Sequence, residues 1–201
     1  MTTNIEYNHK EINDIIIQNV LKMLERRGLI SSHIDEFDKI KLNNSEKTIY
    51  EILLEDKSIC HINIINAKLT TLSSGSQIDD YLSNNVEIYK FLIIKEFTKK
   101  IIKDIIANYL NVEVFLMSEM MEDLPSKIFI SEHKKLNTEE LNELFSKFNE
   151  NEFAKILVTD KMCRYYGGKI GDIFKITRPS FTSGKNIFYR RVVNGTWDIL
   201  F

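Results

Sequence analysis

The sequence predicts an α/β domain over residues 1–123, followed by a small α+β domain over residues 124–201. In the first part, short β-branched segments alternate with segments of helical periodicity, which favours a mixed or parallel sheet with flanking helices. The second part combines helices with several strands. Between them, the polar segment SEMMEDLPS contains Pro125 and marks a change in charge. The net charge is −6 before Leu124 and +4 from there onward.

The first domain opens with two predicted helices. Apolar residues recur at three- and four-residue steps, as on one face of an amphipathic helix, and Gly28 ends this pattern. These apolar residues are Ile12, Ile15, Ile16, Val20, Met23 and Leu24. The segment SSHIDEFDKI (31–40) is typical of a short capped helix.

The rest of the first domain alternates between strands and helices. Short β-branched segments predict strands, and a nearly unbroken apolar segment predicts a strand buried on both faces. The predicted strands are TIYEILL (48–54), HINIIN (61–66), YKFLIIKE (89–96) and VEVFLM (112–117). The predicted helices are SQIDDYLSNN (76–85) and TKKIIKDIIANYL (98–110).

The second domain begins with KIFIS (127–131), and a helix is predicted from Asn137 to Phe148. Asn137 and Glu140 have the three-residue spacing of a capping box, which favours a helix start there. Downstream come AKILV (154–158), a short helix DKMCRYYG (160–167), and the strands DIFKITR (172–178) and NIFYRRVV (186–193).

The C-terminal tail carries a hairpin signal. Asn194-Gly195 between two β-prone apolar segments favours a type I′ turn, so TWDILF (196–201) is predicted to fold back on FYRRVV. The alternative is a free end, which would leave Trp197, Leu200 and Phe201 in water.

Composition sets limits on the class of protein. Hydrophobic residues make up 43% of the 201 residues, which is enough for a packed core. No apolar segment is long enough to cross a membrane, and the N-terminus lacks the apolar stretch of a signal peptide.

Cys60 and Cys163 lie far apart, so neither a metal pair nor a disulfide framework is expected, and we predict a reduced, intracellular protein. Because the net charge is only −2, we expect any contact with nucleic acid to be local or made within a larger assembly.

The segment RYYGGKIGDIFKITRPS, which starts at Arg164, is rich in glycine and basic residues. It lacks the spacing of a phosphate-binding loop or of a dinucleotide-binding loop. GGKIG contains the G-x-x-G of KH domains, but that loop joins two helices, whereas DIFKITR predicts a strand. We therefore favour turn formation, in which Gly167 ends a helix while Gly168 and Gly171 adopt backbone angles that other residues resist.

Few residues suggest catalysis. Cys163 has no histidine near it in sequence, and the four histidines are isolated, so no metal or cofactor site is expected. Asp79, Asp80, Glu87 and Lys90 resemble a nuclease site only weakly, because the spacing of Glu87 and Lys90 is wrong for the usual E-x-K.

Arg178 is a candidate binding residue. In an extended strand, Phe174, Ile176 and Arg178 share one face, whereas Ile173, Lys175 and Thr177 share the other. Arg178 thus lies on the more apolar face, directly before Pro179, which favours extended geometry. An arginine at such a position requires a bidentate partner, in this chain or in another.

The segment from Asp160 to Val193 resembles the C-terminal domain of the fifth subunit of eukaryotic DNA-directed RNA polymerases, a domain that also forms the archaeal counterpart. The upstream SEHKKLNTEELNELFSKF also resembles that family, with His133 at the position of its histidine. The matching residues are Asp160, Arg164, Tyr165, Gly167, Gly171, Lys175, Ile176, Arg178, Pro179, Ser180, Thr182, Gly184, Tyr189, Arg190 and Val192. VLKMLERRGL and KFLIIKEFTKKIIKDII resemble, more loosely, the jaw domain that eukaryotic members carry and archaeal members lack. The departures are Lys161 in place of proline, Gly168 in place of a residue with a side chain, Phe181 in place of an acidic residue, and the tail NGTWDILF.

This resemblance implies a non-catalytic polymerase subunit of a large DNA virus or a divergent eukaryote. Catalysis would belong to the two large subunits, whose active site holds magnesium. The C-terminal domain would dock on the largest subunit, and the N-terminal domain would form part of the lower jaw over downstream double-stranded DNA. The implied location is the nucleus for a cellular protein, or a virion or cytoplasmic viral factory for a viral one.

The implied interface residues are Arg164, Tyr165, Lys175, Arg178, Pro179, Ser180, Tyr189 and Arg190. For Tyr165 and Tyr189, packing in the core is the alternative. The candidate DNA-facing residues are Lys95, Lys99 and Lys100, since KEFTKK is the basic turn after the central strand, and solvated lysines at a helix start are the alternative. Two other readings remain open: a free-standing nucleic-acid-binding protein and a nuclease-like enzyme.

Overall fold

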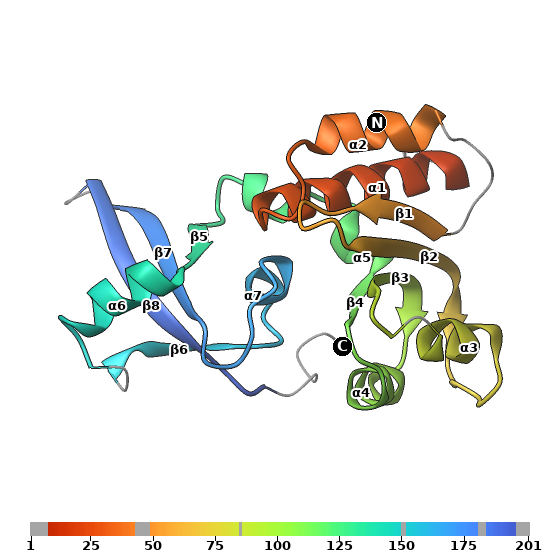
Figure 1. Cartoon of the computed structure of the whole chain (residues 1–201). Coiled ribbons are helices and arrows are strands. Elements are labelled where there is room, and N and C mark those ends of the chain that lie inside the picture. Colours follow the sequence, from red (N-terminus) through yellow and green to blue (C-terminus); the bar gives the residue numbers. More distant parts are fainter. Residues whose placement is uncertain (1–7, 43–48, 85, 150–151, 181–183, 196–201) are drawn as a thin grey trace, which may run out of the picture. The chain divides into compact units, whose positions relative to one another are not determined.

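The computed structural model describes residues 8–42, 49–84, 86–149, 152–180 and 184–195. The chain divides into two compact units, Met1–Glu122 and Asp123–Phe201 (Figure 1). The first unit contains a mixed α/β fold, and the second contains a smaller sheet with short helices.

The first unit starts with the predicted helix pair. Helix α1 (His9–Arg26) begins in a capping box, in which Asn8 accepts a hydrogen bond from the amide of Glu11 and the Glu11 carboxylate accepts one from the amide of Asn8. Gly28 follows the helix with a φ of +69°, a conformation that favours glycine. Helix α2 (His33–Leu42) confirms the second predicted helix.

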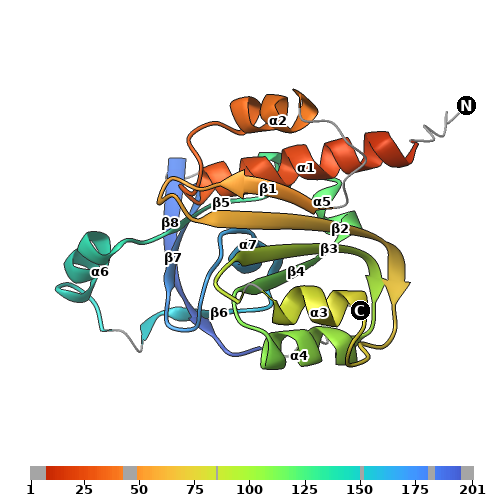
Figure 2. The same ribbon diagram turned by 45° about the vertical axis from the view of Figure 1, so that its right-hand side comes forward.

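The first sheet has the strand order β1-β2-β3-β4, and its strands are β1 (Ile49–Leu53), β2 (Ile59–Leu69), β3 (Tyr89–Phe97) and β4 (Val112–Leu116). β1 pairs antiparallel with β2, whereas β2, β3 and β4 run parallel, so the predicted mixed sheet is confirmed. Helices α1 and α2 lie on one side of it, and α3 (Gln77–Ser83) and α4 (Lys99–Asn108) on the other (Figures 1 and 2). Phe91 to Ile94 of β3 are fully buried, as expected for a strand covered on both faces.

The segment SEMMEDLPS is more than a polar boundary. It contains most of helix α5 (Met117–Met120), whose Met117 and Met120 are buried. The side-chain amide of Asn19 in α1 donates a 2.9 Å hydrogen bond to the carbonyl of Met120. A short 3₁₀ turn (Leu124–Ser126) follows. The first half of the segment thus belongs to the core of the first unit.

The second sheet has the order β5-β7-β8-β6, and its strands are β5 (Glu132–Lys135), β6 (Ala154–Leu157), β7 (Ile173–Ser180) and β8 (Gly184–Val193). β7 pairs antiparallel with β5 and β8, while β6 runs parallel to β8. KIFIS forms a turn that leaves Ile128 and Phe129 exposed, and the strand comes directly after it.

Residues of β7 alternate between two cores. On one face, Phe174 and Ile176 pack with residues that include Cys163 of helix α7 (Lys161–Tyr165). On the other face, Ile173 packs with Leu136 and with Leu144 of helix α6 (Thr138–Phe145). The predicted capping box of Asn137 and Glu140 is confirmed, although α6 ends three residues before Phe148.

The glycine-rich segment is a loop between α7 and β7. Gly167 has a φ of +61° and Gly171 a φ of +97°, which confirms the expected turn geometry at these two positions. The expectation for Gly168 is wrong, because it does not adopt a positive φ. A Cβ atom at Gly168 would instead lie 2.6 Å from Sγ of Cys163 and 2.7 Å from Cε2 of Phe174, so glycine is required for space. Since a strand follows the loop, the helix–loop–helix arrangement of a KH domain is excluded.

The predicted C-terminal hairpin involves residues 196–201, which lie outside the described part of the chain. Arg190–Val193, on which it would fold back, already have β6 on one side. On the other side, the Val192 amide and carbonyl bond to Asp172 and Gly171. Among the described helices, none combines the length and apolar character needed to cross a bilayer.

Candidate subunit interface

The two strands β7 and β8 carry six of the eight predicted interface residues, and strand geometry divides them between two faces. Lys175 pairs with Tyr189 in the antiparallel register, so these two share the α6 face. Arg190 pairs with Phe174 and therefore lies on the α7 face, as does Arg178 by the two-residue period. The single interface predicted from the sequence thus combines residues that lie on opposite faces of a sheet.

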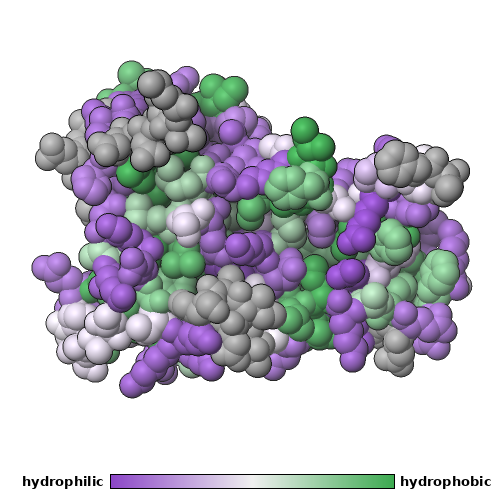
Figure 3. Space-filling view, turned by 180° about the vertical axis from the view of Figure 1, so that it is seen from behind, coloured by the Kyte–Doolittle hydropathy of each residue, from purple (hydrophilic) through white to green (hydrophobic). Residues whose placement is uncertain are grey.

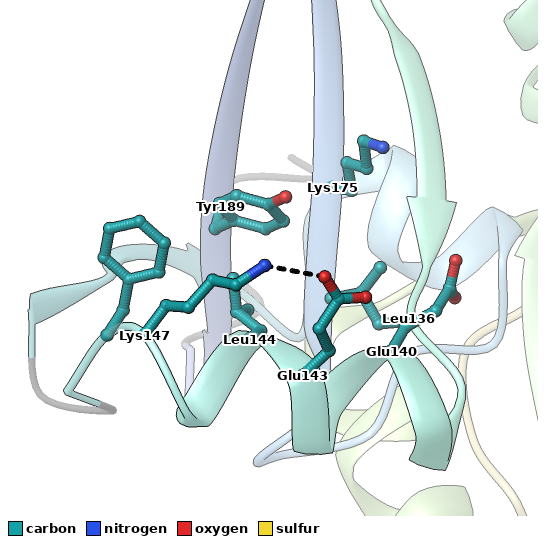
Figure 4. A pocket seen from close by; sticks show the side chains of 8 residues that line it. Leu136, Glu140, Glu143, Leu144, Lys147, Lys175 and Tyr189 are labelled. Carbon is teal, nitrogen blue, oxygen red and sulfur yellow. Dashed lines mark hydrogen bonds and ion pairs between the residues drawn. The ribbon is translucent and has the colours of Figure 1, made fainter.

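The α6 face carries a groove of about 290 Å³ (Figure 4). Its lining residues are Leu136, Glu140, Glu143, Leu144, Lys147, Phe148, Lys175 and Tyr189. Lys147 pairs with Glu143 at 2.7 Å, and Tyr189 packs against Phe153 with ring centroids 6.1 Å apart. Tyr189 is therefore partly a packing residue, the alternative raised from the sequence.

Arg178 is exposed, and its guanidinium lies 5.5 Å from the ring centroid of Phe188. Within the described residues, no acidic side chain forms an ion pair with Arg178. Pro179 is also exposed, and Ser180 is half-buried. Arg178 thus remains open to the bidentate partner that its position predicts.

Arg164 and Tyr165 are less accessible than their proposed role requires. Both belong to α7 and are buried, with exposed fractions of 8% and 2%. Asp160 caps this helix by accepting hydrogen bonds from the amides of Met162 and Cys163. The cap fixes the helix start where Lys161 replaces the proline of the related family. Burial of Tyr165 favours the packing alternative.

His133 of β5 lies on the α7 face of the sheet, because it pairs with Ile176 in the β5–β7 register. Its Nδ1–H donates a 2.7 Å hydrogen bond to the carbonyl of Ser131. Burial lowers the pKa of His133, and the charges of Arg190 and Arg178 lower it further, against the opposing effects of the Ser131 bond and Asp160. The neutral imidazole is therefore the form that the folded chain favours.

This shift predicts that the stability of the second unit depends on pH. The unfolded chain, with an ordinary histidine pKa near 6.5, binds the proton more readily than the folded one, so the free energy of unfolding falls as pH drops below about 6.5. The His133→Gln variant should show a shallower decline between pH 7.5 and 5, measured by urea unfolding. His33→Gln serves as the control and should leave the decline in the second unit unchanged. If the free energy of unfolding of the second unit falls equally steeply with pH in wild type and in His133→Gln, the expectation is contradicted.

Two of the four residues of the nuclease alternative, Asp79 and Lys90, make structural hydrogen bonds. Lys90 is fully buried, and its Nζ donates to the carbonyls of Leu82 at 3.0 Å and Asn84 at 2.7 Å. The Asp79 carboxylate accepts hydrogen bonds from the Tyr109 hydroxyl and the Gly75 amide, and these bonds lower its pKa. In the described ranges, no group of three or more His, Cys, Asp or Glu side chains could hold a metal ion.

Neither cysteine has the character of a nucleophile. Cys60 and Cys163 are fully buried, and burial raises the pKa of each thiol to about 12. A thiol with such a pKa is almost entirely protonated at neutral pH, so it is a poor nucleophile.

The three lysines proposed to face DNA lie where β3 ends and α4 begins. Lys95 and Lys100 are exposed, and Lys99 is half-buried. The first turn of α4 contains no acidic residue, and Thr98 makes no side-chain cap. Lysines at a helix N-terminus are electrostatically unfavourable, so their presence there is not explained by helix stability.

Two features of the structure have almost no signal in the sequence. Arg27 forms a bidentate ion pair with Glu113, with N–O distances of 2.8 and 2.9 Å, although 86 positions separate them. Ile187 and Phe188 of β8 are about half exposed, at 51% and 45%. For the ion pair, the sequence signal is the Arg27-Gly28 dipeptide at the end of the first helix. For the exposed residues, it is the apolar pair Ile187-Phe188 inside a basic strand.

Comparison with known proteins agrees with the resemblance. Residues 123–192 match the family described as RNA polymerase Rpb5, C-terminal domain. The chain is 30% identical over 188 residues to DNA-directed RNA polymerase subunit 5 of Acanthamoeba polyphaga mimivirus, covering 89% of this chain and 91% of that protein. It is 23% identical over 188 residues to the Dictyostelium discoideum protein named DNA-directed RNA polymerases I, II, and III subunit rpabc1, covering 89% and 95%. It is 38% identical over 72 residues to DNA-directed RNA polymerase subunit Rpo5 of Archaeoglobus fulgidus, covering 35% of this chain and 95% of that protein.

Proposed function

Because the chain belongs to the RNA polymerase subunit 5 family, we propose that it is a non-catalytic subunit of a multisubunit DNA-directed RNA polymerase. Lys90 is held by hydrogen bonds to two backbone carbonyls, and the thiols of Cys60 and Cys163 stay protonated at neutral pH. Both observations support a role without catalytic chemistry of its own. Its partners would be other polymerase subunits, and its site of action the nucleus or a viral factory, in line with its eukaryotic and viral relatives.

The second unit is the proposed docking domain, and the largest subunit its partner. The observation that carries this proposal is Arg178, an exposed arginine without an acidic partner among the described residues, inside the segment that matches the family. Arg190 lies on the same face and adds positive charge. An acidic surface on the partner would supply the carboxylates that such arginines bind in pairs.

Docking can be tested by affinity purification of the tagged chain from cells that make the polymerase. Wild type should recover the two largest subunits, and Arg178→Glu should recover roughly tenfold less of them, because charge reversal at an interface replaces attraction by repulsion. Lys155→Glu, an equal charge change at an exposed position of β6 that pairs with Arg191 and so lies on the opposite face, is the control and should match wild type. Equal recovery with Arg178→Glu would place the interface elsewhere, and no recovery with wild type would refute the polymerase assignment.

The first unit is the proposed jaw element near downstream DNA. Lys95, Lys99 and Lys100 lie at the end of β3 and the start of α4, where the positive end of the helix dipole adds to the potential. Contacts of this kind would go to phosphates and would not depend on sequence.

The DNA contact predicts a salt-dependent effect within the assembled polymerase. Replacing Lys95 and Lys100 by glutamate should weaken binding to a DNA duplex and reduce the slope of log K against log salt by about 2, one unit per lost contact. The isolated chain should bind duplex DNA only weakly because its net charge is −2. Tight, salt-dependent binding by the isolated chain would favour the free-standing binder, and metal-dependent cleavage lost on changing Asp80 or Glu87 would favour the nuclease.

A further inference from the structure

One side of β8 is only partly covered. β7 pairs with β8 from Gly184 to Arg191, whereas β6, on the other side, pairs only with Arg190–Val193. From Gly184 to Tyr189, no described strand lies on the β6 side of β8. We call this stretch the hairpin edge.

The register identifies which backbone groups point outward at the hairpin edge. The amide and carbonyl of Val192 bond to Asp172 and Gly171, on the β7 side, whereas the carbonyl of Val193 accepts from Val158, on the β6 side. Because these directions alternate along a strand, the amides and carbonyls of Lys185, Ile187 and Tyr189 point away from β7. Tyr189 borders the ladder with β6, which starts at Arg190, so Lys185 and Ile187 are the residues of the hairpin edge that present both their donors and their acceptors farthest from β6.

The side chains of the hairpin favour a particular kind of neighbour. Ile187 and Phe188 are about half exposed, one on each face of β8. The described residues of β7 and β8 contain no aspartate or glutamate. They contain the basic residues Lys175, Arg178, Lys185, Arg190 and Arg191. In the space-filling view, hydrophobic and hydrophilic residues lie interspersed over this unit, on the right of Figure 3.

We propose that another polymerase subunit adds an extended, acidic segment to the hairpin edge as a fifth strand of the second sheet. This inference rests on the proposed function and specifies how the second unit docks. An added strand would pair the backbone groups of Lys185 and Ile187, cover the two apolar side chains, and place carboxylates near the basic residues.

The alternatives fit the hairpin edge less well. Phosphates of nucleic acid offer acceptors for the amides but no donors for the outward carbonyls, which would stay unpaired. A second copy of this chain would bring one basic hairpin against another, and like charges at an interface are repulsive.

Residue-resolved hydrogen exchange tests the pairing directly. In the free full-length chain, the amides of Lys185 and Ile187 should exchange rapidly, whereas that of Phe188, directed at β7, should exchange slowly. In the assembled polymerase, the amides of Lys185 and Ile187 should slow by roughly tenfold or more, since backbone pairing protects amides, while Phe188 stays slow. Unchanged exchange at Lys185 and Ile187 in a polymerase that contains the chain would overturn the inference and leave the proposed function standing.

A matched pair of variants at Ile187 separates the contribution of the backbone amide to docking from that of the apolar side chain. Ile187→Pro removes the outward amide, and an edge strand tolerates proline where its amide faces solvent. Ile187→Thr removes apolar surface but keeps the amide. After thermal unfolding has verified that both variants fold, Ile187→Pro should reduce recovery of polymerase subunits roughly tenfold, and Ile187→Thr clearly less.

The remaining outcomes are also decisive. Equal recovery with Ile187→Pro and Ile187→Thr would overturn strand addition. If a DNA duplex added to the free chain slows exchange at Lys185 and Ile187, the occupant is nucleic acid and the proposal fails. If the wild-type chain enters no polymerase at all, the failure lies with the proposed function.

Discussion

Replacing Arg27 by methionine should lower the free energy of unfolding of the first unit by about 3 kcal/mol, near the lower limit for breaking a buried ion pair. The Arg27 side chain is only 6% exposed, and its guanidinium donates to both carboxylate oxygens of Glu113. Burial alone lowers the pKa of Arg27, but the Glu113 carboxylate reverses the direction and raises it. In the variant, the Glu113 charge would lose its cation and keep the hydrogen bond from the Tyr89 hydroxyl. Glu113 is 22% exposed, so some solvation remains and the lower limit applies.

The loss can be measured by native-state hydrogen exchange in urea, read at the buried amides of β3, which report on the first unit alone. Lys68→Met breaks the exposed pair with Glu96 in the same unit and should cause no measurable change. The double variant Arg27→Met/Glu113→Met should be more stable than Arg27→Met, because it removes the unpaired charge as well. If the first unit of Arg27→Met is as stable as that of Lys68→Met, the Arg27–Glu113 pair contributes little to stability.

Gly168→Ala should destabilise the second unit by about 1–3 kcal/mol, the usual cost of forcing extra volume into a packed core. The new Cβ atom would meet the buried Cys163 and Phe174 at distances shorter than van der Waals contact. Neither side chain can move aside easily, because Cys163 and Phe174 both belong to the core between α7 and the sheet.

The cause can be separated from backbone strain. Phe174→Leu makes room beside residue 168, so the two substitutions together should cost less than the sum of the single effects, as expected for residues in contact. Gly171→Ala is the contrasting control, because a Cβ there meets nothing within 4 Å but the φ of +97° is unfavourable. Its cost should add to that of Phe174→Leu. Additive costs for Gly168→Ala and Phe174→Leu would contradict steric crowding as the cause.

The fold was largely predictable because its signals are local. The spacing of apolar residues in α1 and the unbroken apolar run of β3 each identify one type of element. The turn at Ile128 and Phe129 and the polar strand β5 were not predictable in this way. β5 is a strand because His133 and its neighbours pair with β7, and such pairing depends on residues about forty positions away in the chain.

The candidate site was predictable residue by residue but not as a surface. A family resemblance indicates Lys175, Arg178 and Tyr189 together, yet only the β7–β8 register separates Lys175 and Tyr189 from Arg178. The Arg27–Glu113 pair leaves no periodic signal, since its partners lie on different elements. Burial of Arg164 likewise depends on tertiary packing that the sequence does not display.

The position of β8 inside the second sheet has a consequence for how the protein is made. In chain order β8 comes after β5, β6 and β7, yet it lies between β7 and β6. While the chain emerges from a ribosome, β6 therefore has no partner until residues up to Val193 have left the exit tunnel. The β7–β8 ribbon is local and can form at once, whereas β6 must then add across a longer stretch of chain. Completion of this sheet is thus a late event of synthesis, and a nascent chain that stalls before Gly184 exposes unpaired strands to aggregation.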